Sequence, residues 1–189
     1  MTHIGERADA RANRDRVVQA ARAVFAERGS GAEIREIAER AGVGMGTVYR
    51  NFANRDELMA AIVGECIDEA NDLMARAEAA SSPLEGLQIL LGGGWQLAEI
   101  QGDLLDMLKQ QQSVHDTRSG RMHERMAALL SSAVDAGVVR GDVPVPFLSA
   151  LLMSLFTTYP EMRRELGSEV AQRVSTDAFF RVALVQPLA

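Results

Sequence analysis

Polar side chains on one short stretch have the types and spacing that DNA recognition needs. Thr47, Arg50 and Asn51 alternate there with the apolar Val48 and Phe52. In a helix, two residues four apart share a face, so Val48 and Phe52 point one way and the polar side chains point elsewhere. An arginine can donate two hydrogen bonds to a guanine edge, and an asparagine amide can pair with an adenine edge.

The residues before this stretch predict the element that positions it. An apolar stripe at i, i+3, i+4 and i+7 indicates a helix with one buried face: Ile34, Ile37, Ala38 and Ala41. Gly42 follows, and glycine most easily supplies the positive φ of a helix end. A second short helix is expected over 44–51. This is the layout of a helix-turn-helix, whose second helix offers its polar face to the DNA major groove.

A helix over about 13–28, ended by Gly29, is expected to precede this motif. Residues 1–13 have no apolar periodicity, but arginines recur through 7–16: Arg7, Arg11, Arg14 and Arg16. Two interpretations stay open. The segment is a solvated tail, or it is an arm whose arginines reach phosphates or a minor groove.

A long helix should follow the motif. Asn54 at the N-cap and Glu57 three residues later resemble a capping box. An apolar stripe then runs from Leu58 to Ala77, which is long enough to leave the first domain and enter a second. Cys66, the single cysteine, lies on this stripe, so we expect a packed core thiol in a reducing cytoplasm.

The segment AGVGMGTVYRNFANRDEL, with AARAVFAERG at 20–29 and IREIA at 34–38, resembles the N-terminal domain of the TetR family of bacterial repressors. The resemblance covers about 45 residues without a gap. The matching positions are Phe25, Gly29, Ile37, Ala38, Ala41, Gly42, Val43, Gly46, Thr47, Tyr49, Phe52 and Leu58. The chain departs from the family pattern at three positions, with Gly44 for the usual Ser, Asn51 for His and Arg55 for Lys. We therefore expect a weaker cap at Gly44.

The resemblance, together with residue chemistry, implies DNA-binding roles for eight residues: Arg35, Met45, Gly46, Thr47, Tyr49, Arg50, Asn51 and Arg55. Arg50 is the best candidate for reading a guanine edge, and Asn51 for an adenine. Arg35 and Arg55 are expected phosphate clamps. The alternative for Arg35 and Arg40 is that each merely forms an ion pair with a nearby glutamate.

Charge is distributed unevenly. The chain has a formal net charge of −6, but residues 1–59 hold 10 Arg and 9 acidic residues, about +1. The acidic excess lies in 60–189, so a basic face can exist on the first domain. We place the domain boundary between 1–58 and 59–189 and expect an all-α fold of about nine helices.

Residues 84–185 predict five further helices, over about 84–101, 103–113, 120–136, 146–158 and 168–185, with a polar loop at 113–120. Gly92, Gly93 and Gly94 inside the first of them cost about 1 kcal/mol each relative to alanine. Either close helix packing compensates, or the missing side chains leave room for a ligand beside Trp95. Candidate ligand-binding residues are Trp95, Met107, Gln111, Met122, Met126 and Phe156. Alternatively, these methionines pack in the hydrophobic core and bind no ligand.

The helix over 146–158 is apolar nearly all round, and that over 168–185 has a second apolar face, so a partner chain should cover part of each. The TetR resemblance implies that the last two long helices pair across a two-fold axis. The expected interface residues are Leu151, Leu155, Val174, Ala178, Phe179 and Val182.

Other classes of protein are disfavoured. His115 and His123 match no metal-ligand spacing, and no strand precedes the glycines at 42–46 as a nucleotide loop requires. No catalytic constellation and no apolar run long enough for a membrane span appears. We therefore expect no enzyme, cofactor or metal. The sequence favours a cytoplasmic, homodimeric repressor that a small molecule releases from a palindromic operator. A regulator without a small-molecule inducer, or an activator, is the alternative.

Overall fold

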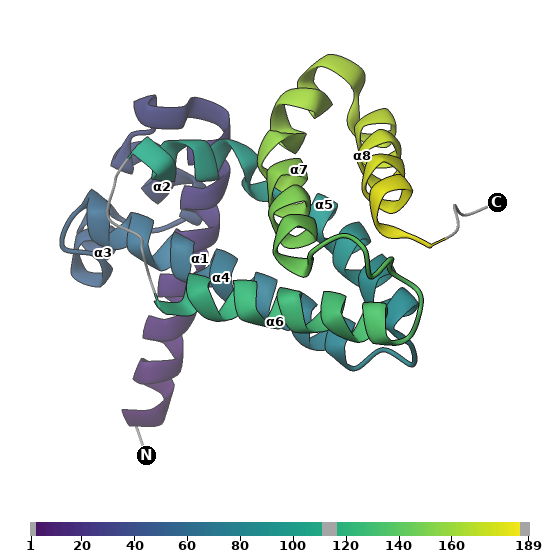
Figure 1. Ribbon diagram of the computed structural model, residues 1–189. Helices are drawn as coiled ribbons and strands as arrows, with labels where there is room; N and C mark the ends of the chain where they lie inside the picture. Colours follow the sequence, from purple (N-terminus) through teal and green to yellow (C-terminus); the bar gives the residue numbers. More distant parts are fainter. Residues whose placement is uncertain (1–2, 111–116, 186–189) are drawn as a thin grey trace. The chain divides into compact units, whose positions relative to one another are not determined.

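The computed structural model describes residues 3–110 and 117–185, with side chains over 11–29, 31–99 and 121–185. These residues are all-α, as predicted, and form no strand (Figure 1). The helices are α1 His3–Arg28, η1 Gly29–Gly31, α2 Ile34–Ala41, α3 Met45–Asn51, α4 Arg55–Glu78, α5 Pro83–Gln110, α6 Thr117–Asp135, α7 Val145–Leu166 and α8 Ser168–Ala183. None of the described helices is long and apolar enough to cross a membrane.

The chain divides into two compact units. One contains Met1–Cys66 and Asp103–Gln112, and the other contains Ile67–Gly102 and Ser113–Ala189. Helix α4 begins in the first unit and ends in the second, as its long apolar stripe predicted. A functional boundary between 58 and 59 stays a prediction.

In the first unit, α1, α2, α3 and the start of α4 share one hydrophobic core. Its largest fully buried side chains are Phe25, Ile37, Phe52, Leu58 and Ile62. Gly29 (φ 59°) and Gly42 (φ 66°) occupy the left-handed region where α1 and α2 end, as expected. Cys66 is buried in this core, which confirms the packed thiol.

The expected start of the first helix was wrong. Helix α1 begins at His3 rather than near residue 13, so the described part of the N-terminal segment is helical. Alanines and arginines recur through 7–16, and both residue types have high intrinsic helix propensity. A helix can therefore extend past its buried stripe without further apolar contacts.

The second unit differs from expectation in three helices. Helix α5 is continuous where two helices were predicted, so the described residues hold eight α-helices rather than about nine. Helix α6 begins at Thr117, inside the predicted loop, of which 113–116 lie outside the described residues. Helix α7 continues beyond 158 through the buried Pro160 to Leu166, and Gly167 (φ 80°) is its C-cap.

Candidate nucleic-acid interface

Helix α3 buries Val48, and its C-cap Phe52 is buried too, while a face with both polar and apolar side chains is exposed to solvent. Val48 and Phe52 are each 1% exposed, whereas Met45 is 43% and Tyr49 52% exposed. Gly44 occupies the N-cap without any side-chain hydrogen bond, so the weaker cap is confirmed. The exposed face of α3 therefore has the layout that a recognition helix requires.

Arg50 lies along this exposed face. Its Nε donates to the carbonyl of Gly46 at 3.1 Å, and Nη2 donates to Oγ1 of Thr47 at 2.9 Å. These two bonds use two of the five guanidinium N–H groups. The remaining donors suit a bidentate contact to a guanine edge, and the two bonds hold the side chain over the first turn of α3.

Asn51 makes a side-chain hydrogen bond within α3. Its Nδ2 donates to the carbonyl of Thr47 at 2.8 Å, and the side chain is half-buried. The amide is therefore held against the preceding turn of α3. This bond uses one of the two Nδ2 hydrogens and leaves Oδ1 available, so the contact to an adenine edge stays a prediction.

Arg55, an expected phosphate clamp, makes two contacts within the first unit, and its role toward phosphate stays a prediction. Its Nη1 donates to the carbonyl of Ala32 at 3.1 Å, and Cζ lies 4.8 Å from the ring centroid of Phe25. The first turn of α4 is capped as predicted, because Asn54 Oδ1 accepts the Glu57 N–H at 2.8 Å. Helix α4 thus begins in a fixed orientation on the first unit.

Arg35 and Arg40 both pair with glutamates. Arg35 Nε contacts Glu39 Oε1 at 3.2 Å on the exposed face of α2. Arg40 makes a bidentate bond to Glu27 of α1, at 2.7 and 2.8 Å. An exposed pair between i and i+4 contributes at most about 0.5 kcal/mol, so Arg35 can exchange its carboxylate for a phosphate at low cost.

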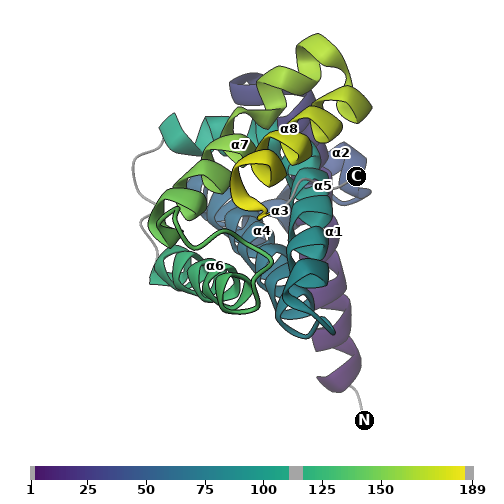
Figure 2. The ribbon, with the colours of Figure 1, turned by 45° about the vertical axis from the view of Figure 1, so that its right-hand side comes forward.

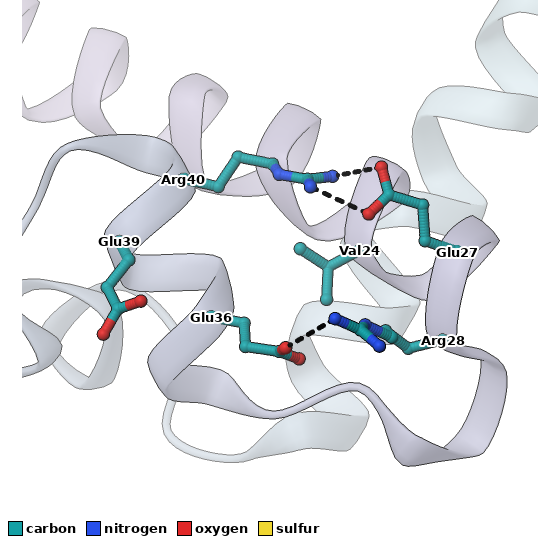
Figure 3. A pocket seen from close by; sticks show the side chains of 6 residues that line it. All are labelled: Val24, Glu27, Arg28, Glu36, Glu39 and Arg40. Carbon is teal, nitrogen blue, oxygen red and sulfur yellow. Dashed lines mark hydrogen bonds and ion pairs between the residues drawn. The ribbon is translucent and has the colours of Figure 1, made fainter.

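A surface depression of about 300 Å³ lies between α1 and α2 (Figure 3). Two ion pairs cross it, Arg40 with Glu27 and Arg28 with Glu36 at 3.5 Å. The hydrogen bond from Arg40 lowers the pKa of Glu27 below its ordinary value. Three glutamates face two arginines here, so the depression is unsuited to phosphate and instead fastens α2 to α1.

In the second unit, the space above two of the three glycines is filled. A Cβ on Gly93 would lie 2.3 Å from Cδ1 of Leu73, and one on Gly94 would lie 2.4 Å from the ring of Phe156. A Cβ on Gly92 would meet nothing within 4 Å. Close packing is therefore the role of Gly93 and Gly94 in this structure.

Trp95 lies in the same packed core. It is 1% exposed, its ring centroid is 4.5 Å from that of Phe156, and Nε1 donates to Oγ1 of Thr176 at 2.8 Å. Met126 is buried and Met122 half-buried against this core. The side chain of Met107 and all of Gln111 lie outside the described residues. The four described candidates thus share one hydrophobic cluster, in which Trp95 already has a polar partner.

Sequence reasoning missed a contact between α4 and α6. Arg125 donates to both carboxylate oxygens of Glu78 at 2.8 Å and to Oδ1 of Asn71 at 3.0 Å. No local pattern predicts a partner so far away in the chain. The contact ties α6 to the part of α4 that belongs to the second unit.

One of the six residues predicted for the dimer interface, Phe179, is not available to a partner chain. Phe179 is fully buried within its own chain, where its ring contacts Phe180. On the same helix Val174 is 42% exposed and Ala178 is exposed. Leu151, Leu155 and Val182 are half-buried. Position 179 therefore faces inward, and the interface role of the other five residues stays a prediction.

Taken together, α2 and α3 are joined through a left-handed glycine, and α3 has the exposed face of a recognition helix. This arrangement defines a helix-turn-helix DNA-binding protein. Residues 17–62 match the family described as "Bacterial regulatory proteins, tetR family". The chain belongs to this family, and it is a TetR-family transcriptional regulator.

The similar proteins agree with this assignment. The HTH-type transcriptional repressor KstR2 of Mycobacterium tuberculosis is 28% identical over 177 residues, which cover 85% of this chain and 86% of that protein. The solved structure of the TetR transcriptional regulator SCO0520 from Streptomyces coelicolor is 24% identical, with a TM-score of 0.67 over 92% of this chain and 99% of that one. The structure of the ketosteroid regulator KstR2 of Mycobacterium tuberculosis is 23% identical, with a TM-score of 0.70 over 92% and 95%. At these identities the two structures show a shared fold.

Proposed function

We propose that this regulator is a homodimeric repressor, acting in the cytoplasm, that a small molecule releases from a palindromic operator. The observation that supports it most is the exposed face of α3, where Met45, Tyr49 and Arg50 stand clear of the core. The repressor KstR2 resembles this chain over most of its length, which favours repression over activation.

A two-fold dimer would cover the exposed apolar surface of α7 and α8 and would also suit the DNA-binding domain. Val174 and Ala178 on α8, with the half-buried Leu151 and Leu155 on α7, leave apolar surface for a second copy. A dimer would bring two recognition helices to successive major grooves of a palindrome. A half-site would then bind much more weakly than the full site.

The ligand would act through the second unit by binding one conformer better than the other. The cluster of Trp95, Phe156, Met122 and Met126 suits an apolar ligand, because methionine side chains repack readily. The similar KstR2 structure is named a ketosteroid regulator, which favours a ligand of that apolar character. The filled space above Gly93 and Gly94 favours a second candidate, a regulator that responds to no small molecule.

The test is fluorescence anisotropy with the DNA upstream of the protein's own gene, at several salt concentrations. We expect tight binding, steep salt dependence and weak competition by a half-site. Affinity no better than for random DNA would remove the proposal. A thermal-shift screen of apolar small molecules then separates the two candidates, because only the first gives compounds that stabilise the protein and release the DNA.

A further inference from the structure

The N-terminal part of α1 continues a core-facing stripe with arginines. Val18, Ala21 and Phe25 are each fully buried on one face of α1. Counting back by four and then three residues from Val18 reaches Arg14 and Arg11, which fall on the same face. Arg7 precedes Arg11 by four residues. We call Arg7, Arg11 and Arg14 the N-terminal basic stripe.

This stripe starts beside the recognition helix. Cζ of Arg14 lies 4.9 Å from the ring centroid of Phe52, the C-cap residue of α3. Arg14 is exposed although it touches this buried ring, and Arg11 is exposed one turn further out. The ring fixes where the guanidinium lies and leaves its charge intact.

From that contact α1 runs on past the helix-turn-helix. In both views the N-terminal end of α1 extends beyond α2 and α3 (Figure 1, Figure 2). Residues 7 to 14 rise about 10 Å along a helix, a length that can follow the sugar-phosphate backbone at the edge of a groove. The stripe is therefore an extension of the surface that α3 begins.

We propose that the N-terminal basic stripe binds DNA phosphates that flank the major groove occupied by α3. The inference rests on the proposed DNA binding and adds a second contact region to it. Phosphates are the target because arginines on a helix outside the groove meet the backbone first, whereas base edges need insertion. The stripe then lengthens the bound site and raises affinity without changing base preference.

Arg16 provides a matched control. It is exposed on the same helix, but two residues from Arg14 it points to the other side, and its guanidinium bonds to Asn13. Arg11→Gln and Arg16→Gln remove one charge each and replace arginine by another good helix former. Any difference between the two variants reports position on the helix rather than net charge.

The experiment measures the Kd of the full chain by anisotropy over a range of salt, on the upstream DNA and on a duplex trimmed to the palindrome. The variants are Arg11→Gln, Arg7→Gln with Arg11→Gln, and Arg16→Gln. On the long duplex each stripe substitution should reduce the slope of log affinity against log salt by about 0.9. The double variant should lose about tenfold or more in affinity, with Arg16→Gln unchanged. On the trimmed duplex all variants should match the wild type.

Circular dichroism checks that α1 keeps its helix in every variant. Equal effects of Arg11→Gln and Arg16→Gln on the long duplex would overturn the stripe while leaving the proposed function intact. A wild type that binds the upstream DNA no better than random DNA overturns the proposed function itself, so the two failures are distinguishable.

Discussion

Arg55 donates a hydrogen bond to the carbonyl of Ala32 at 3.1 Å, although the two residues lie 23 positions apart. The same guanidinium covers the ring of Phe25 at 4.8 Å. One side chain therefore joins the first turn of α4 to the residue that follows η1 and to the core face of α1. Its position in the family pattern predicts a phosphate contact, and these two internal contacts add a structural role.

Arg55→Ala should therefore destabilise the first unit. A charged hydrogen bond and a ring contact together contribute about 1–2 kcal/mol at a half-buried site. Urea unfolding of Arg55→Ala should show a loss of this size, and Arg55→Lys a smaller one. Unchanged stability with weakened DNA binding would instead restore the phosphate clamp.

Arg50→Ala should relax base preference with little change in folding. Arg50 is exposed and bonds only within α3 among its described contacts. Loss of a bidentate base contact costs about 1–3 kcal/mol at one base position. Anisotropy with single-base operator variants measures this, with the exposed Arg76→Ala on α4 as the charge-matched control. A loss that is uniform across all variants would assign Arg50 to a phosphate.

Gly92 and Gly94 of α5 should respond differently to alanine. Gly92→Ala should stabilise the protein by about 0.5–1 kcal/mol, since its Cβ meets open space and alanine favours the helix. Gly94→Ala should destabilise it by about 1–3 kcal/mol, because the Cβ would lie 2.4 Å from the ring of Phe156. Thermal unfolding compares the two. Equal stabilisation by both would mean that this space is open in solution, as a ligand pocket requires.

The pair of Glu78 and Arg125 should make stability depend on pH. The hydrogen bond from Arg125 lowers the pKa of Glu78 below its ordinary 4.5. A carboxylate with a depressed pKa in the folded state stabilises at pH values above 4.5, and this contribution is lost as the pH falls further. Both side chains are partly exposed, so solvent screening limits the contribution to about 1 kcal/mol or less.

Glu78→Gln tests that dependence, because glutamine resembles the protonated acid. Urea unfolding should show the variant less stable than wild type at pH 7, with the difference shrinking below pH 4.5. Glu124→Gln, exposed on α6, is the charge-matched control. A difference that is constant with pH would show that the ion pair does not contribute.

Val174→Arg should separate the proposed dimer into folded monomers, since Val174 is 42% exposed on α8. Light scattering at micromolar concentration measures the mass. Phe179→Ala should behave differently and cost about 3–5 kcal/mol of folding stability, because this side chain is fully buried in its own chain. A monomeric wild type would contradict the dimer.

Local spacing alone was enough to predict the helix-turn-helix. The helix-turn-helix pattern depends on contacts between residues a few positions apart: the spacing of Ile34, Ile37, Ala38 and Ala41, and the glycine after them. Contacts of this kind can be predicted from the sequence alone. The cap at Asn54 and the buried stripe of α4 were equally local. The internal ends of helices were less predictable: α5 continues where two helices were predicted, and α7 continues through Pro160.

The sequence by itself therefore determined the class of fold, the recognition helix and the side chains that this helix exposes. Only the tertiary structure decided which polar groups are already occupied: Arg55 by Ala32 and Phe25, and Arg40 by Glu27. It also decided that Phe179 faces inward and that Leu73 and Phe156 fill the space above Gly93 and Gly94. The physical reason is the same in each case. Periodicity fixes the face on which a residue lies, whereas its partners come from distant segments that only the folded chain brings within hydrogen-bonding or packing distance.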